Sequence, residues 1–150
     1  MIVTKAINIH AEANKIWPFF IEPEKVLQWC ITFRKFEYTS DQHSGVGTTI
    51  YIEEQAGGPL MKMQFQITDC KENEKLALRM TSGNGVKSYE QWWSLDAVPE
   101  GSRFTFKEEI ELPYGAIGKL LGLILEGMSA ATVDKMLVKL KSLAESEREG

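Results

Sequence analysis

The chain has 150 residues, a length that fits one domain with its own hydrophobic core. Apolar residues make up 43% of it and charged residues 25%, which are ordinary values for a globular protein. The formal net charge is −4 and no block of basic residues occurs, so we expect no nucleic-acid partner. Two cysteines, Cys30 and Cys70, are too few for a disulfide framework in a domain of this size.

No stretch of the sequence predicts insertion into a membrane. The first ten residues lack the long apolar core and the cleavage site of a signal peptide. The most apolar stretch, residues 114–133, is interrupted by Lys119 and Glu126 and is rich in glycine. We therefore expect a cytoplasmic protein without an integral membrane segment.

The first strand and two short helices are predicted between Met1 and Trp29. Val3, Ile7 and Ile9 alternate with polar residues, as in a strand with one buried face. Residues 11–17 are typical of a helix, which Pro18 keeps short or bent. A second helix is expected from Pro23 to Trp29, because proline suits the first helical position.

The middle of the chain predicts six more strands. Turn signals such as Gly83-Asn84-Gly85 separate runs of alternating apolar and polar residues, and Pro113 follows the last run. Such short connections imply antiparallel pairing, which gives an α+β fold: a curved antiparallel sheet of about seven strands with one long helix across it. The six runs are residues 33–39, 48–55, 60–69, 75–80, 86–98 and 103–112.

The long helix is expected over residues 114–149, and it carries two apolar stripes. The stripes lie more than about 100° apart around the helix axis, so one straight helix cannot turn both toward one sheet. We expect a break between Gly127 and Ala131, with a continuous helix that rotates its face over a twisted sheet as the alternative. The stripes are Ile117, Leu120, Leu121, Ile124, Leu125 and Met128, and then Val133, Met136, Leu137, Leu140, Leu143 and Ala144.

The order of these elements is accompanied by a series of short motifs spread over residues 2–145. They are Lys15-Ile16-Trp17, Glu22-Pro23-Glu24, Trp29, Gly45-Val46-Gly47, Trp93-Ser94-Leu95, Gly101 to Thr105, Tyr114-Gly115, Gly118 to Leu121, Leu137, Leu140 and Lys141. Together they resemble the helix-grip superfamily called SRPBCC, which includes START domains, birch-pollen-allergen-like proteins and polyketide cyclases. The polyketide cyclase/dehydrase and lipid-transport branch is the most similar.

This resemblance implies a single START-like ligand-binding domain over residues 1–150, with a cavity between the concave face of the sheet and the long helix. The expected occupant is a small hydrophobic molecule such as a lipid or a polyketide, and no cofactor is expected. Methionines suit such a lining because they adapt to irregular shapes. The predicted ligand-binding residues are Trp29, Tyr51, Met63, Phe65, Leu78, Met80, Tyr89, Trp93, Phe106, Leu121, Ile124, Leu125 and Met128.

Two residues are candidates for acid–base chemistry. Glu108 follows Phe106 with the period of a strand, so it could face a dry cavity, stay protonated and act as a general acid. Tyr89, which shares a face with Gln91 and Trp93, is the second candidate. The alternative for Glu108 is a place at the open rim, solvated or paired with a lysine or arginine. No metal site is expected, because neither His10 nor His43 has partners at ligand spacing.

The leucines of residues 120–125 cover more than one helical stripe, so Leu123 should be at least partly exposed. A hydrophobic gate over the cavity, a homodimer contact and docking on a membrane surface are the three explanations, and we favour the gate. For the whole chain, the leading hypothesis is a carrier of a small hydrophobic ligand. The alternatives are a cyclase- or dehydratase-type enzyme and a protein-interaction module that uses these leucines.

Overall fold

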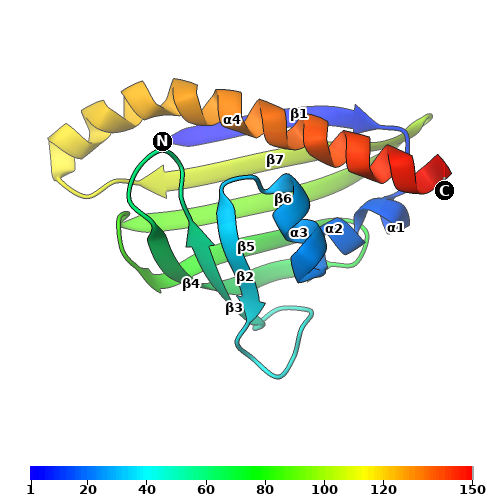
Figure 1. Cartoon of the computed structure of the whole chain (residues 1–150), viewed down its shortest axis with the longest axis horizontal. Coiled ribbons are helices and arrows are strands. Elements are labelled where there is room, and N and C mark those ends of the chain that lie inside the picture. The colour runs from blue at the N-terminus through cyan, green and yellow to red at the C-terminus, as the bar shows by residue number, and fades with distance from the viewer. Residues whose placement is uncertain (150) are drawn as a thin grey trace.

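A computed structural model describes residues 1–149 and confirms the predicted architecture (Figure 1). Seven antiparallel strands form one curled sheet in the order β1-β7-β6-β5-β4-β3-β2, so only the β1–β7 pairing joins strands distant in sequence. Helix α4 runs along β1 and β7, and the short helices gather beneath its C-terminal half. The strands are β1 (Ile2–Ile9), β2 (Phe33–Tyr38), β3 (Thr49–Glu54), β4 (Met61–Lys71), β5 (Lys75–Gly83), β6 (Ser88–Val98) and β7 (Gly101–Glu111), and the helices are α1 (Ala13–Ile16), α2 (Pro18–Ile21), α3 (Pro23–Trp29) and α4 (Gly115–Glu149).

The segment between β1 and β2 contains three short helices where the sequence predicted two. Trp17 is the residue between α1 and α2: it is the C-cap of the first helix and the N-cap of the second. Pro18 occupies that first position, where its missing N–H costs no hydrogen bond, so the proline starts a new turn as well as ending the old one.

Aromatic side chains close one end of the concave face. Trp29 of α3 is fully buried, with its ring edge-on to Trp93 of β6 at 5.0 Å and to Phe104 of β7 at 5.6 Å between ring centres. Its indole Nε1 donates a 2.8 Å hydrogen bond to the carbonyl oxygen of Phe19. Edge-on aromatic pairs stabilise the folded protein by more than their buried area alone would. Because Trp29, Trp93 and Phe104 are all fully buried and in contact, this end of the interior is tightly packed.

The break expected near residues 127–131 is wrong, because α4 is continuous from Gly115 to Glu149. Its second half buries the second predicted stripe, including Val133 and Leu140. At about 100° per residue, Gly118 and Gly122 lie on that same side of the helix, and both are buried. The inward face of the first turns is therefore built from glycine, and Ile117, Leu120 and Ile124 of the first stripe are exposed to solvent.

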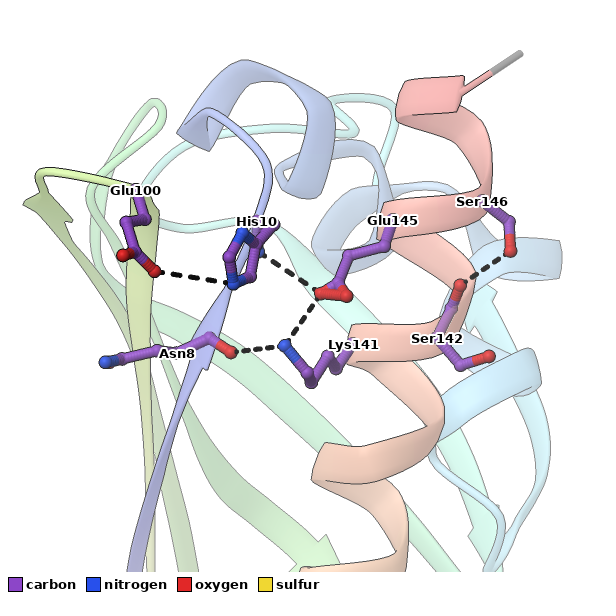
Figure 2. A network of polar contacts seen from close by, with 7 residues as sticks. All are labelled: Asn8, His10, Glu100, Lys141, Ser142, Glu145 and Ser146. Carbon is purple, nitrogen blue, oxygen red and sulfur yellow. Dashed lines mark hydrogen bonds and ion pairs between the residues drawn. The ribbon is translucent and has the colours of Figure 1, made fainter.

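Polar contacts fasten the C-terminal half of α4 to the end of β1 (Figure 2). Lys141 Nζ donates to the carbonyl oxygen of Asn8 at 2.9 Å and to the Glu145 carboxylate at 2.8 Å. The same carboxylate accepts from the backbone N–H of His10 at 3.2 Å, and the His10 ring lies 3.5 Å from a Glu100 oxygen. These contacts join the helix, β1 and the β6–β7 turn at one corner of the molecule.

Helix α4 is also more apolar than the sequence analysis allowed. The segment Gly115–Glu147 is long and apolar enough to cross a membrane, with a mean hydropathy of 1.4 in its most apolar window, of which 17% is buried. Its second half nevertheless supplies core side chains such as Val133 and Leu140. Length and composition alone therefore do not identify a membrane span here.

Candidate functional site

A cavity of about 440 Å³ lies between the middle of α4, the end of β7 and the loops that flank β2 and β3. Its walls are largely apolar, and the buried carboxyl of Glu108 forms part of them. The solid aromatic packing around Trp29 lies elsewhere in the interior, since neither Trp29 nor Trp93 lines the cavity. The apolar walls and their polar edge include Ile110, Leu125, Met128, Ser129, Val133 and Met136.

A second buried carboxyl, that of Glu54, lies close to this wall. In β3 the buried residues are Ile50, Ile52 and Glu54, so the alternation that builds the core carries the carboxyl inward at the end of the strand. The hydroxyl of Thr32 donates a 2.6 Å hydrogen bond to Glu54 Oε2. This acid is therefore held within the interior and away from bulk water.

Tyr89 of β6 links the two carboxyl groups. Its hydroxyl lies 2.9 Å from Glu54 Oε1 and 3.4 Å from Glu108 Oε2. Two strands, β5 and β4, separate β6 from β3 in the sheet order. The contact with Glu54 is made only because the sheet curls and brings the inward faces of distant strands together.

Gln91 sets the direction of the hydrogen bonds in this cluster. Trp93 Nε1 is a donor only, so the Gln91 oxygen that lies 2.9 Å from it must be the acceptor. The Gln91 amide nitrogen then donates to the Tyr89 hydroxyl at 2.8 Å, which leaves the Tyr89 proton for Glu54. Glu108 Oε2 accepts only a long contact of 3.4 Å from the Gln91 amide, and it lies 3.4 Å from the Tyr89 hydroxyl.

The electrostatic setting differs for the two acids. Burial raises the pKa of Glu54, while the hydrogen bonds from Thr32 and Tyr89 act to lower it. Burial, and then the nearby charge of Glu54, raises the pKa of Glu108 to about 7. Neither carboxyl forms an ion pair with any lysine, arginine or histidine in residues 1–147. Glu54 thus has the shorter hydrogen bonds, and Glu108 is the acid whose pKa lies near neutral pH.

The same environment affects two neighbouring groups. Burial raises the pKa of Tyr89 well above its ordinary value, and the charges of Glu54 and Glu108 raise it further. The Cys30 thiol, also buried, has its pKa raised for the same reasons in the same order. Both groups therefore stay neutral near pH 7, and Glu108 is the member of the cluster suited to give and take a proton there.

The structure places the two predicted acid–base candidates together. Glu108 and Tyr89 both face inward and lie in one cluster, and the alternative of a solvated or ion-paired Glu108 at the rim is wrong. Sequence reasoning missed Glu54 and Thr32. The signal for Glu54 was present, because it continues the parity of Ile50 and Ile52, whereas the sequence analysis singled out Tyr51 on the opposite parity.

The predicted ligand-binding residues divide into four groups. Leu125 and Met128 line the cavity. Tyr51 lies on the other face of the sheet, with its hydroxyl on Glu53, and neither Leu121 nor Ile124 lines the cavity, so we leave these three out of the proposed site. Met80 is half-buried. The remaining residues are fully buried side chains of the inward faces: Trp29, Met63, Phe65, Leu78, Tyr89, Trp93 and Phe106.

Two other kinds of site are weaker candidates. Within the described residues no group of three or more His, Cys, Asp or Glu side chains is placed to hold a metal ion. A hollow of about 530 Å³ lies at the start of α4, beside Met1, Pro113 and Gly118. It contains none of the buried acids, so the cavity at Glu108 is the stronger candidate.

The fold defines the class of the protein: a helix-grip domain, in which a curled sheet and a long C-terminal helix flank a cavity. A family model described as "Polyketide cyclase / dehydrase and lipid transport" matches residues 1–145. The chain belongs to this family.

Solved structures share the same fold at low sequence identity. TTHA0849 from Thermus thermophilus is 16% identical with a TM-score of 0.81, and the match covers 98% of this chain and 99% of that one. A START superfamily protein from Mycobacterium smegmatis is 15% identical with a TM-score of 0.75 and 97% coverage of both chains. The Zhui aromatase/cyclase from Streptomyces sp. R1128 is 13% identical with a TM-score of 0.75, covering 97% of this chain and 93% of that one. No curated protein matches the sequence.

Proposed function

We propose that the protein binds a small hydrophobic ligand in the cavity between the sheet and α4, acting as one ligand-binding domain over residues 1–150. The observation that carries this proposal is an apolar cavity of about 440 Å³ whose wall includes a buried carboxyl without a cationic partner. Ligand sites are typically mostly apolar hollows with a few convergent polar groups, and this volume lies within their ordinary range of about 300–1,000 Å³. Membership of a family described by cyclase and lipid-transport functions agrees with it.

Native mass spectrometry of freshly purified protein, followed by a lipid and aromatic-compound screen, tests the proposal. We expect a bound mass in the range of a small lipid or a polycyclic compound. The variant Ser129→Phe adds a ring to the cavity wall and should abolish binding, because Ser129 is half-buried and lines the cavity. The matched control Ser142→Phe changes an exposed residue of the same helix and should bind normally.

The proposal would be overturned if no compound bound, or if Ser129→Phe bound ligand as well as the control did. Thermal unfolding of both variants is measured alongside, so that a loss of binding is distinguished from a loss of folded protein.

The second candidate function is an enzyme of the cyclase or dehydratase kind that uses the same cavity. It is favoured by one observation: the pKa of Glu108 is raised to about 7, where a carboxyl is best suited to give and take a proton. Once a substrate is known, Glu108→Gln should abolish turnover while the ligand still binds. Unchanged turnover would reject Glu108 as the acid–base group.

The third candidate is a protein-interaction surface on α4, with a homodimer as its simplest form. It is favoured by the exposure of Leu123, at 71%, and of the first stripe, in which Ile117 is 67% exposed. Leu123→Glu should abolish any self-association seen by analytical ultracentrifugation and leave the fold intact. A cytoplasmic location and the lack of a nucleic-acid partner remain predictions from the sequence.

A further inference from the structure

One oxygen of Glu108 has no partner in the protein. Oε2 accepts the long contact from the Gln91 amide and neighbours the Tyr89 hydroxyl, and no hydrogen bond in residues 1–147 engages Oε1. Among the described residues no fully buried side-chain oxygen lacks a partner, so Oε1 is open to the cavity that Glu108 lines. Because Oε2 is already an acceptor, a proton held by this carboxyl belongs on Oε1 and points at the ligand space.

The charges around Glu108 decide what this oxygen would meet. From β3, β6 and the end of α3, it is faced by Glu54, Tyr89 and Cys30, none of which carries a positive charge. Two cationic side chains also line the cavity, Arg34 of β2 and Lys135 of α4, and neither is in an ion pair within residues 1–147.

The third cationic group lining the cavity is the amino group of Met1, which donates to the Ile110 carbonyl oxygen at 2.9 Å. A ligand ammonium would have to pass or neighbour these three cations. A neutral oxygen acceptor would meet no such repulsion, and the open Oε1–H would supply the hydrogen bond that it needs.

We propose that the cavity selects hydrophobic ligands carrying a neutral oxygen acceptor, a carbonyl or hydroxyl, which accepts a hydrogen bond from the protonated Glu108 carboxyl. This inference rests on the proposed ligand-binding function and deepens it. Binding then requires the neutral acid and is linked to proton uptake. Since the pKa of Glu108 is about 7, the binding-competent fraction falls as pH rises through that value.

Three probes with one ring system test this: 2-acetylnaphthalene as the neutral acceptor, 2-ethylnaphthalene as the hydrocarbon, and 1-(2-naphthyl)ethylamine as the ammonium. At about pH 6 the ketone should bind about tenfold more tightly than the hydrocarbon, because a tenfold gain in affinity is what one well-formed hydrogen bond typically contributes. Between about pH 6 and pH 8.5 its affinity should fall by up to about 30-fold, in proportion to the protonated fraction. The hydrocarbon should show no such change.

Variants separate this inference from a general pH effect. Glu108→Gln keeps an N–H donor at the position, so it should retain the ketone preference and lose the pH dependence. Glu109→Gln, one residue along β7 and outside the cavity, should behave like the wild type. Calorimetry in two buffers with different ionisation heats should show uptake of roughly half a proton per ketone bound near pH 7.

Two results would overturn the inference and leave ligand binding standing. One is equal affinity for the ketone and the hydrocarbon at both pH values. The other is tightest binding of the amine, with an affinity that rises as Glu108 ionises. A third result would overturn the proposed function together with the inference. In it, none of the three probes binds, and native mass spectrometry finds the same bound mass, or the same lack of one, in Ser129→Phe and in the wild type.

Discussion

The buried Glu108 carboxyl predicts that stability falls as pH rises toward neutrality, and that Glu108→Gln removes this loss. An ordinary glutamate has a pKa near 4.5, whereas the pKa of Glu108 in the folded protein is about 7. Between these values the folded state holds a proton that the unfolded chain has released. The contribution of Glu108 to the free energy of unfolding is therefore fully present below about pH 4.5 and is lost as pH rises to about 7.

The magnitude is set by the two pKa values. Their difference of about 2.5 corresponds to about 3 kcal/mol, at roughly 1.4 kcal/mol per pKa unit. Glu108 is only 6% exposed, so solvent screening reduces this figure little. Part of this free energy comes from Glu54, because its nearby charge is the second cause of the raised pKa of Glu108.

Guanidinium unfolding of wild type, Glu108→Gln and Glu109→Gln at about pH 5 and pH 8 provides the assay. Relative to Glu108→Gln, the wild type should lose about 2.5 kcal/mol between the two pH values, because an unfolded glutamate is already partly ionised at pH 5, and Glu109→Gln should follow the wild type. Parallel pH profiles for the wild type and Glu108→Gln would refute the reasoning, because they would mean that Glu108 is solvated or paired in solution.

Two further predictions concern helix α4, each with a matched control. Leu140→Ala should lower the free energy of unfolding by about 3 kcal/mol, because Leu140 is fully buried. Leu120→Ala should change it by less than about 0.5 kcal/mol, because Leu120 is 62% exposed. Equal effects of the two variants in chemical denaturation would contradict the placement of the two stripes. Gly118→Ala should destabilise the protein by more than about 1 kcal/mol, because its methyl group would collide with the Pro113 carbonyl oxygen, whereas Gly127→Ala, which meets open space, should stabilise the helix by about 1 kcal/mol. A rise in melting temperature for Gly118→Ala would show that the start of α4 does not pack against its preceding loop.

The sheet was predictable because its signals are local. Alternation of apolar and polar residues marks each strand, as in Met63, Phe65 and Ile67 of β4, and glycine or proline marks the turns. The same alternation placed Tyr89, Gln91 and Glu108 on inward faces. Any feature that depends only on residue order within one strand was therefore available before the structure.

The site itself depends on features that no single strand encodes. Tyr89 meets Glu54 across two intervening strands, and that contact is a result of how far the sheet curls. Curvature arises from register shifts such as the one between Ile67 and Asp69 in the β4–β5 pairing, which the hydrophobic pattern does not reveal. Glu54 therefore looked like the polar end of a strand and not like a member of a buried cluster.

Helix α4 misled the sequence analysis for a different physical reason. The first stripe is strongly apolar, and an apolar face is ordinarily the buried face of a helix. Here the buried side of that half is formed by Gly118 and Gly122, which carry no hydrophobic signal at all. A small residue facing the interior is invisible to a pattern based on hydrophobicity, so two stripes that could not share one face were interpreted as two helices.

This arrangement of α4 also explains the hollow at the start of the helix, because Gly118 and Gly122 line it without side chains that could fill it. Turning the first stripe inward would place Leu121 and Ile124 where Gly118, Gly122 and Ser129 now face the protein. Such a rotation of a continuous helix would also turn Val133 and Leu140 out of the core, and it would break the contacts of Lys141 with β1. The buried second half and its polar anchor therefore fix the rotation of the whole helix, which leaves Ile117, Leu120 and Leu123 on the outer surface.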